Sequence, residues 1–324
     1  MNTMKRILSA VLTVTAAMTL SACSAGTGAE GGAAGYPKQP INMIVPVAAG
    51  GSSDTMARAM STVAEQYLGE PLIIENKEGA GGTVATTEFM ADKPDGYNLM
   101  LAHAAIFTSQ PKMQNVAYSA DDFEGVIGLS VQPVVLVVGK DSPYQTFEDL
   151  ADSGDEITFA GNSVGSIPHI GTMDLFSQAG VKATHIPFNG AAAGITALLG
   201  GQVDAAACHP DEVVSYVDSG DVRILGVMTP ERFASIPDVP TFQEMGYDVD
   251  YSVWKSILVP KGTDPEIKQY LYDAFSKLLE DLDVKTYFEN AGIELQVMTG
   301  EEVDEKLRSE VDAYSEVIDS LGLV

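Results

Sequence analysis

Short apolar runs alternate with amphipathic stretches along the first third of the chain. Residues 41–45 (INMIV), 71–75 (PLIIE) and 97–101 (YNLML) have the length and composition of strands. Between them, residues 55–68 and 83–91 place their apolar side chains at helical spacing. Strands that alternate with helices form parallel sheets covered by helices. The pattern therefore predicts an α/β lobe at the start of the folded region.

A valine-rich apolar run interrupts this alternation at residues 125–139 (GVIGLSVQPVVLVVG). The run is too long for one ordinary strand and too rich in β-branched residues for a good helix, so we interpret it as two strands, the second entering another lobe. A second alternating series follows from Ile157 to Val222, and the extended run 252–260 (SVWKSILVP) returns to the first lobe. The pattern predicts two α/β lobes (36–133 with 253–324, and 134–252), each doubly wound and joined by two crossing strands, with a ligand cleft between them.

The N-terminus has the features of an export signal. Lys5 and Arg6 precede an apolar stretch, residues 7–20, that is too short to span a bilayer. It ends in Leu-Ser-Ala-Cys, which resembles the processing site of bacterial lipoproteins, so we expect a signal peptide over 1–22 and a lipid on Cys23. An ordinary signal peptide is the alternative. The Gly/Ala-rich residues 23–35 are typical of a flexible tether, and we expect an extracytoplasmic protein anchored to the membrane only through its lipid.

Charge and cysteine content narrow the function further. The chain has 45 acidic and 18 basic residues, a formal net charge of −27, which argues against nucleic acid and anionic lipid as partners. If Cys23 is lipidated, Cys208 is left alone and no internal disulfide can form. The four histidines show no metal-ligand spacing, and no cofactor motif is present. An anionic ligand would have to be bound by local features that overcome the acidic surface.

The loop after the first strand offers such a feature. Residues 45–54 (VPVAAGGSSD) place two glycines and two serines just before a predicted helix. The first N–H groups of a helix have no intrahelical partner and carry a partial positive charge, which suits a carboxylate or phosphate. Simple N-capping by Ser52 or Ser53 is the alternative interpretation.

A second glycine/serine loop, residues 161–166 (GNSVGS), contains the G-x-S-x-G pattern of serine hydrolases. In those enzymes the helix starts directly after the serine, but Pro168 would break a helix that began at Val164. Pro168 instead fits the first turn of a helix, with Ser166 or Ile167 as its N-cap. No histidine and aspartate have spacing that singles out a triad with Ser163. We therefore predict a second anion-binding loop, with a hydrolase that uses Ser163 as the alternative.

Several motifs together resemble the Bug-type extracytoplasmic solute receptors of tripartite tricarboxylate transporters, the TctC family. The resemblance extends from Tyr36 to nearly the end of the chain. It rests on Tyr36–Ile41, Val45–Asp54, Glu75–Gly82 (ENKEGAGG), Pro94–Tyr97 (PDGY), Ile186–Gly190 (IPFNG), Leu199–Asp204 (LGGQVD) and Pro237–Gly246. It implies a two-lobed fold of the type II periplasmic-binding-protein class and a receptor that is not an enzyme. Such a receptor closes around a small carboxylate (a di- or tricarboxylate, acidic amino acid or aromatic acid) and delivers it to the large and small subunits of a membrane permease.

The resemblance also assigns site residues. It implies that one carboxylate meets backbone amides and hydroxyls of the two loops, and that the far end of the cleft is lined by residues after the third strand and around the Phe188 turn. We expect Asp54 to orient its loop or to accept a hydrogen bond from the ligand, rather than to meet the carboxylate. The expected site residues are Ala49, Gly50, Gly51, Ser52, Ser53, Asp54, His103, Ala104, Asn162, Ser163, Ser166, Phe188, Asn189, Gly190 and Asp204.

The sequence departs from the family pattern at a few positions. Val47 stands where phenylalanine is usual, Glu78 where proline is common, and Asn189 where lysine is common. The last change removes a positive charge that could meet a second carboxylate. We expect Gly79–Gly82 to be a structural turn, and the protein to be a monomer. A ligand sensor that acts on a membrane signalling partner would bind the same ligands and remains an alternative to transport.

Overall fold

The computed structural model describes residues 35–324, and these residues build two β-sheets. The predicted signal peptide and Cys23 lie outside the described residues. The first sheet has the strand order β11-β4-β10-β3-β1-β2, and the second has the order β7-β6-β8-β5-β9. We call the parts of the chain around these sheets lobe 1 and lobe 2. The strands are β1 (Ile41–Val45), β2 (Leu72–Asn76), β3 (Asn98–His103), β4 (Phe123–Pro133), β5 (Val135–Gly139), β6 (Glu156–Ala160), β7 (Lys182–Ile186), β8 (Ala205–Cys208), β9 (Val222–Val227), β10 (Ser252–Pro260) and β11 (Glu294–Thr299).

Helices cover both faces of each sheet. In lobe 1 they are α2 (Ser52–Ser61), α3 (Ala64–Leu68), α4 (Thr83–Phe89), α5 (Gln110–Met113), α10 (Pro265–Leu279), α11 (Leu282–Asn290) and α12 (Gly300–Ser320), with single 3₁₀ turns η1 (Ala80–Gly82), η2 (Ala104–Ile106) and η3 (Ala120–Asp122). In lobe 2 they are α6 (Phe147–Ala151), α7 (Ile167–Ala179), α8 (Ala191–Leu199) and α9 (Pro210–Asp218). None of the helices in residues 35–324 combines the length and hydrophobicity that a membrane crossing requires.

The strand pairing confirms the predicted α/β class and adds antiparallel strands to it. β1 pairs in parallel with β2 and β3, and β6 pairs in parallel with β7 and β8. The crossing strands are antiparallel to their neighbours: β10 to β3 and β4, and β5 to β8 and β9. Both sheets are therefore mixed, because a strand that crosses between lobes enters each sheet from the opposite end.

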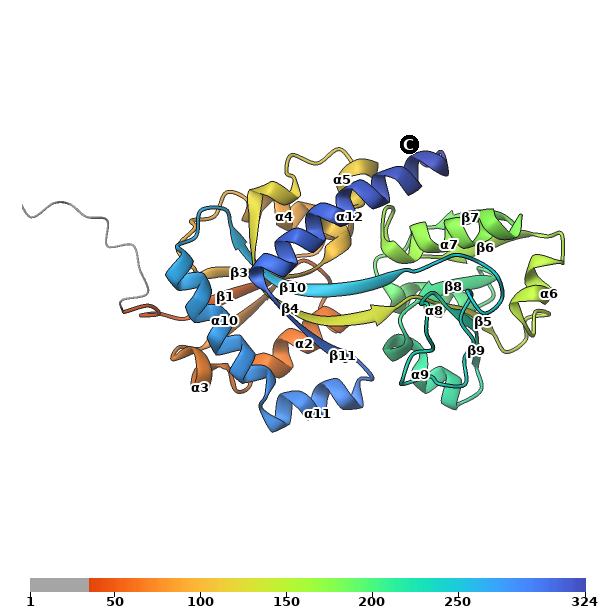
Figure 1. The fold of residues 1–324 in the computed structure, drawn as a ribbon. Coiled ribbons are helices and arrows are strands. Elements are labelled where there is room, and N and C mark those ends of the chain that lie inside the picture. The colour runs from red at the N-terminus through yellow and green to blue at the C-terminus, as the bar shows by residue number, and fades with distance from the viewer. Residues whose placement is uncertain (1–34) are drawn as a thin grey trace, which may run out of the picture. The chain divides into compact units, whose positions relative to one another are not determined.

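Two long strands form the connection between the lobes (Figure 1). β4 ends at Pro133, and β5 begins in the other sheet only two residues later, at Val135, so the valine-rich run is two strands as predicted. β10 runs back beside β4 from Ser252 to Pro260. Both strands are almost entirely buried, which explains their unbroken apolar sequence.

Each sheet separates two apolar clusters. In lobe 1, Phe275 and Leu278 of α10 pack on one face, while Phe89 of α4 packs on the other. In lobe 2, α7 and α8 cover opposite faces. The last turns of α12 leave lobe 1: Tyr314 and Ile318 pack into the core of lobe 2. The C-terminal helix thus contacts both lobes, whereas the sequence pattern placed residues 253–324 in lobe 1.

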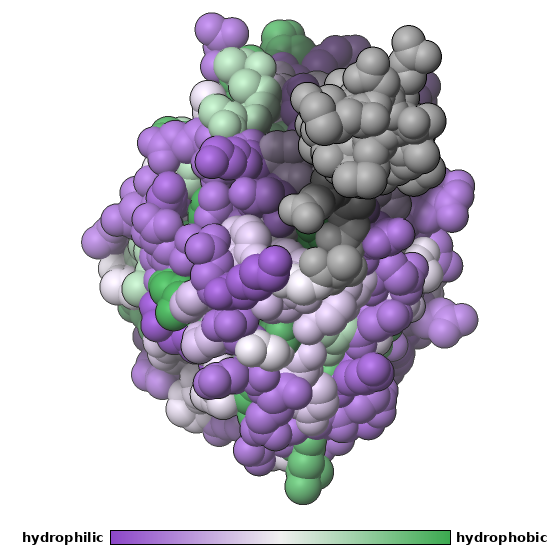
Figure 2. All heavy atoms as spheres, turned by 90° about the vertical axis from the view of Figure 1, so that its left-hand side faces the viewer, coloured by the Kyte–Doolittle hydropathy of each residue, from purple (hydrophilic) through white to green (hydrophobic). Residues whose placement is uncertain are grey.

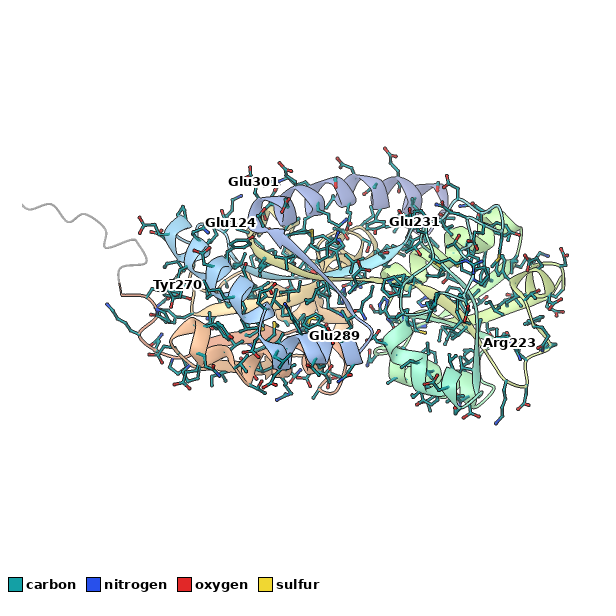
Figure 3. The ribbon with its side chains drawn as sticks, turned by 60° about the horizontal axis from the view of Figure 1, so that its bottom comes forward. Glu124, Arg223, Glu231, Tyr270, Glu289 and Glu301 are labelled. Atoms are coloured by element: carbon teal, nitrogen blue, oxygen red, sulfur yellow. The ribbon has the colours of Figure 1, made fainter. Side chains whose placement is uncertain are left out.

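The outer surface of lobe 1 is hydrophilic. Figure 2 shows mainly hydrophilic side chains at this end of the molecule, with hydrophobic ones scattered among them. Glu289 and Glu301 of lobe 1, which Figure 3 labels, are exposed acidic side chains. Scattered surface hydrophobics are ordinary for a folded protein, and the described residues visible on this face form no large apolar patch.

Candidate functional site

A cavity of about 740 Å³ lies between the two lobes. Its walls come from the loops that follow β1, β3, β6, β7 and β8, and from the crossing strand β10. The parallel strands of both lobes thus direct their carboxyl ends toward one space, which is where open α/β sheets bind ligands. The lining includes these expected site residues: Ala49, Gly50, Gly51, Ser52, Ser53, His103, Asn162, Ser163, Ser166, Phe188, Asn189 and Gly190.

The start of α2 forms the cavity wall in lobe 1. Gly51 is the N-cap residue, and no side chain accepts a hydrogen bond from the first turn of this helix. Gly50 has φ +86°, a conformation that suits glycine and turns the loop toward the cavity. The unpartnered N–H groups of this turn can therefore bind an anion.

Asp54 holds the α2 loop from behind. It is 2% exposed and does not line the cavity. Its carboxylate accepts hydrogen bonds from the Gly50 N–H (2.8 Å) and from Arg58 Nε (3.0 Å). Burial acts to raise the pKa of Asp54, but these hydrogen bonds outweigh it and the pKa is lowered overall. Of the two roles expected for Asp54, these contacts favour orienting the loop.

Two helices of lobe 2 begin at the opposite wall. α8 has Gly190 as its N-cap, again with no side-chain cap, and Gly190 to Ala192 line the cavity. α7 is capped by Ser166, whose hydroxyl accepts from the His169 N–H (3.3 Å) and donates to the Gly161 carbonyl (2.5 Å). The Ser166 hydroxyl is therefore used within the loop. Asn162 and Ser163 also line the cavity.

Ser163 is not arranged as a nucleophile. Its hydroxyl oxygen accepts from Gln110 Nε2 (3.3 Å), a side chain of lobe 1. The ring of His169 is directed elsewhere, since its Nδ1 accepts from the Gly165 N–H (3.2 Å). His169 stacks on His185 at 3.9 Å between ring centroids, and burial lowers the pKa of His169 to about 3 and that of His185 to about 4. A general base for Ser163 would have to be close to its hydroxyl, so the loop is better suited to holding a ligand.

Besides Asp54, two expected site residues lie outside the cavity lining. Asp204 precedes β8, at the amino end of a parallel strand, whereas the cavity is at the carboxyl ends. Its carboxylate accepts from the N–H (2.8 Å) and the hydroxyl (2.6 Å) of Thr158. Ala104 is 2% exposed and packs in the core of lobe 1, and it is Ala105 that lines the cavity.

Other lining residues were not expected. Gly79, Gly81 and Gly82, interpreted above as a structural turn, line the cavity as well as leading into α4. The cavity floor contains a charged cluster that the loops alone do not indicate: His209, Asp211, Glu212 and Lys255. Asp211 and Glu212 lie in the first turn of α9, shortly after the carboxyl end of β8, a position that could have indicated them. Lys255 lies within the apolar strand β10, where a lone charged residue was the available signal.

Lys255 is the centre of this cluster. It is 3% exposed, and its ammonium donates to Ser52 Oγ (3.0 Å) and to Gln132 Oε1. Asp211 accepts from Ser52 Oγ (3.1 Å) and from Gln132 Nε2 (2.6 Å), which closes a ring of four side chains that we call the Lys255 ring. Burial lowers the pKa of Lys255, although the nearby Asp211 and Glu212 act to raise it. The ring joins α2 of lobe 1 to α9 of lobe 2 through β4 and β10.

His103 is neutral at the same floor. Burial, with Lys255 and His209 nearby, lowers its pKa to about 3. A neutral imidazole provides one hydrogen-bond donor and one acceptor. His103 can therefore hydrogen-bond a ligand without adding charge to the cavity.

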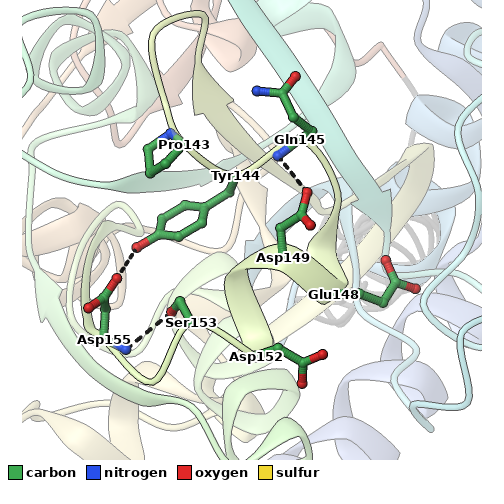
Figure 4. A pocket seen from close by; sticks show the side chains of 8 residues that line it. All are labelled: Pro143, Tyr144, Gln145, Glu148, Asp149, Asp152, Ser153 and Asp155. Carbon is green, nitrogen blue, oxygen red and sulfur yellow. Dashed lines mark hydrogen bonds between the residues drawn. The ribbon is translucent and has the colours of Figure 1, made fainter.

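A second, shallower hollow lies around α6 in lobe 2 (Figure 4). Its acidic side chains have structural roles: Asp149 accepts from the Gln145 and Thr146 N–H groups (both 2.9 Å), and Asp155 accepts from the Tyr144 hydroxyl (2.9 Å). An acidic hollow repels anions. Within residues 35–324, no group of three His, Cys, Asp or Glu side chains is arranged to hold a metal ion.

Comparison with known proteins agrees with this geometry. Residues 56–323 match the sequence model of the tripartite tricarboxylate transporter family receptor. The chain is 30% identical to protein BugT of Bordetella pertussis over 308 residues, which is 92% of this chain and 94% of BugT. It superposes on the periplasmic binding protein BugD with a TM-score of 0.81 at 30% identity, covering 89% of this chain and 99% of BugD. MatC from Rhodopseudomonas palustris, solved with bound malate, gives a TM-score of 0.79 at 28% identity over 87% of this chain and 100% of MatC.

These matches extend over most of the chain, and the family model includes residues of both lobes. They also account for the arrangement around Ser163, because the matched family consists of receptors rather than enzymes. The chain belongs to the tripartite tricarboxylate transporter receptor family.

Proposed function

We propose that this protein is an extracytoplasmic receptor that captures a small carboxylate in the cavity between its lobes. One observation carries the proposal: α2 of lobe 1 and α8 of lobe 2 both begin at this cavity, and neither has a side-chain cap. Each such terminus presents free N–H groups and about half a positive charge. Two of them, one from each lobe, can hold a carboxylate between the lobes. The malate bound in MatC supports the same ligand chemistry.

Closure of the lobes would retain the ligand, and several contacts of lobe 1 with the 161–166 loop support a closed arrangement. Ser109 donates to the Gly165 carbonyl (2.6 Å), and Gln114 donates to the Val164 carbonyl (2.9 Å). Receptors of this kind retain a ligand by hinge closure about a few connecting segments. Here the hinge is formed by β4 and β10.

A thermal-shift panel of small carboxylates, run on the purified full chain, tests the binding role. A ligand at a hundredfold excess over its Kd stabilises the folded state by about 2.7 kcal/mol, and for a chain of this size we expect a melting shift of a few degrees. The shift should be lost or reduced in Ser53→Ala and in Ser163→Ala. Ser177→Ala, on the exposed side of α7, is the matched control and should keep it. A flat response of the wild-type chain to every carboxylate would rule out the proposal.

We further propose that Cys23 carries the lipid anchor and that the loaded receptor, acting as a monomer, delivers its ligand to the large and small permease subunits. The short apolar stretch that ends in Leu-Ser-Ala-Cys supports the anchor, and the family supports the partner. Cys23→Ser should release the protein from the membrane fraction without changing its ligand affinity. Deletion of the receptor should abolish uptake of radiolabelled ligand by cells that retain both permease subunits. Unchanged uptake would instead favour a sensing role.

A further inference from the structure

Lys255 lies where the two lobes meet the cavity. It belongs to β10, where its backbone is paired with His103 at the end of β3 and with Ser130 of β4. Its side chain is 3% exposed and lines the cavity. Lysine is almost never buried to this extent unless a counterion accompanies it.

Direct partners of the ammonium are neutral. Ser52 Oγ and Gln132 Oε1 accept two of its three N–H groups. In the described part of the chain, Lys255 forms no ion pair and its third N–H has no acceptor. Asp211 is connected to it only through Ser52 and Gln132, which donate to the two carboxylate oxygens of Asp211.

No carboxylate contacts this buried charge directly. Asp211 and Glu212 lie close enough to stabilise the ammonium, but Glu212 accepts from the His209 N–H (2.9 Å) instead of from Lys255. Removing an ammonium from water is costly, and direct contact with an anion is the usual way to offset that cost. Even the exposed Lys140 has such a contact, with Asp221 (2.8 Å). Because the free N–H of Lys255 belongs to a residue that lines the ligand cavity, a ligand carboxylate is the group that can contact it directly.

We propose that Lys255 is a specificity-determining residue of this receptor and binds a second carboxylate of the ligand, so that the cavity selects dicarboxylates over monocarboxylates. This inference rests on the proposed function, in which the helix N-termini bind the first carboxylate. The Lys255 ring holds the ammonium in place: Ser52 and Gln132 fix its position, and Asp211 fixes both of them. Selectivity then comes from the crossing strand β10, and not only from the loops that form the cavity walls.

The test compares ligands that differ only by one carboxylate. Succinate with butyrate, and adipate with hexanoate, are titrated calorimetrically into the full chain and into Lys255→Met. The wild-type chain should bind the dicarboxylate of at least one pair more tightly, by about tenfold or more. Lys255→Met should weaken that dicarboxylate by about 10- to 100-fold and change the monocarboxylate by less than about threefold. Lys140→Met makes the same change of charge at an exposed site and should behave as wild type.

Lys255→Gln is measured beside the methionine variant. Lys255→Gln keeps a hydrogen-bond donor but loses the charge. If Lys255→Met does not fold, Lys255→Gln still tests the role of the charge. Equal weakening of both members of a pair would assign Lys255 a structural role and overturn the inference, and so would an unchanged dicarboxylate affinity. A wild-type chain that binds monocarboxylates as tightly as dicarboxylates refutes the role of Lys255 but leaves the receptor intact. A chain that binds no carboxylate refutes the proposed function itself.

Discussion

Gly81 offers a direct test of closure between the lobes. It lies in the η1 turn of lobe 1, directly against Ser163 of lobe 2, and both residues line the cavity. A Cβ at this position would lie 2.5 Å from Ser163 Oγ, 2.9 Å from Ser163 Cβ and 3.0 Å from Gln110 Nε2. Rotation of the serine hydroxyl would relieve the first contact but not the second. Gly81→Ala therefore has to separate the lobes or distort the 161–166 loop.

The cost of this substitution has two parts. Gly81 has φ +69°, and an alanine in the left-handed region costs about 1–2 kcal/mol in any conformation of the lobes. Overpacking of a close contact costs about 1–3 kcal/mol more, and this part applies only to the closed form. If closure is required for tight binding, the second part lowers ligand affinity by about 5- to 150-fold.

Gly154→Ala is the matched control. Gly154 has φ +72°, nearly the same as Gly81, but a Cβ there meets no atom within 4 Å. Urea unfolding should show a loss of about 1–2 kcal/mol for both variants. Calorimetric titration with the carboxylate found in the panel should show weaker binding for Gly81→Ala alone. Wild-type affinity in Gly81→Ala, or an equal loss in Gly154→Ala, would refute the closure argument.

Two further predictions concern the groups behind the loops. Burial and the neighbouring His185 lower the pKa of His169 to about 3, compared with about 6.5 in an unfolded chain. As the pH falls, the unfolded state therefore binds this proton before the folded state does. The free energy of unfolding should decrease below about pH 6.5, by about 2 kcal/mol at pH 5. Urea unfolding at pH 7 and pH 5 should show this loss reduced in His169→Gln, and an unchanged pH dependence would contradict it. Asp54→Asn removes the charge that holds Gly50 and Arg58, so melting and titration should show a loss of about 1–3 kcal/mol together with weaker ligand binding. Weaker stability with unchanged binding would mean that Asp54 does not position the loop.

Features that depend on neighbouring residues were predictable from the sequence. Pro168 excluded a helix that started directly after Ser163, and the structure begins α7 at Ile167 with Ser166 as its N-cap. The valine-rich run forms two strands separated next to Pro133, as expected because the run is longer than one ordinary strand. In each case the decisive physical effect, such as the missing N–H of proline or the typical length of a strand, acts within a few residues.

Features that depend on distant residues were not predictable. Ser52 and Lys255 are 203 positions apart in the chain, yet they share a hydrogen bond at the cavity floor. The sequence SVWKSILVP does not indicate which side of β10 faces the cavity. Nearly every residue of that strand is buried, so its two sides do not differ in an apolar and polar pattern. Asp204 shows a second kind of error. Its motif was recognised in the sequence, but Asp204 lies at the amino end of β8, whereas the cavity is at the carboxyl ends of the parallel strands.

The cavity also explains how a protein with a formal net charge of −27 can bind an anion. Exposed carboxylates act on a ligand through water, and at physiological salt their field decays over about 8 Å. In the proposed mode of binding, the helix N-termini and Lys255 would act at contact distance inside the cavity, where electrostatic interactions are stronger than in bulk water. The cavity would then set the affinity, while the acidic surface mainly slows the approach of anions. Because extended polyanions cannot enter the cavity, they meet only that repulsive surface, and the same charge distribution that permits a small carboxylate excludes them.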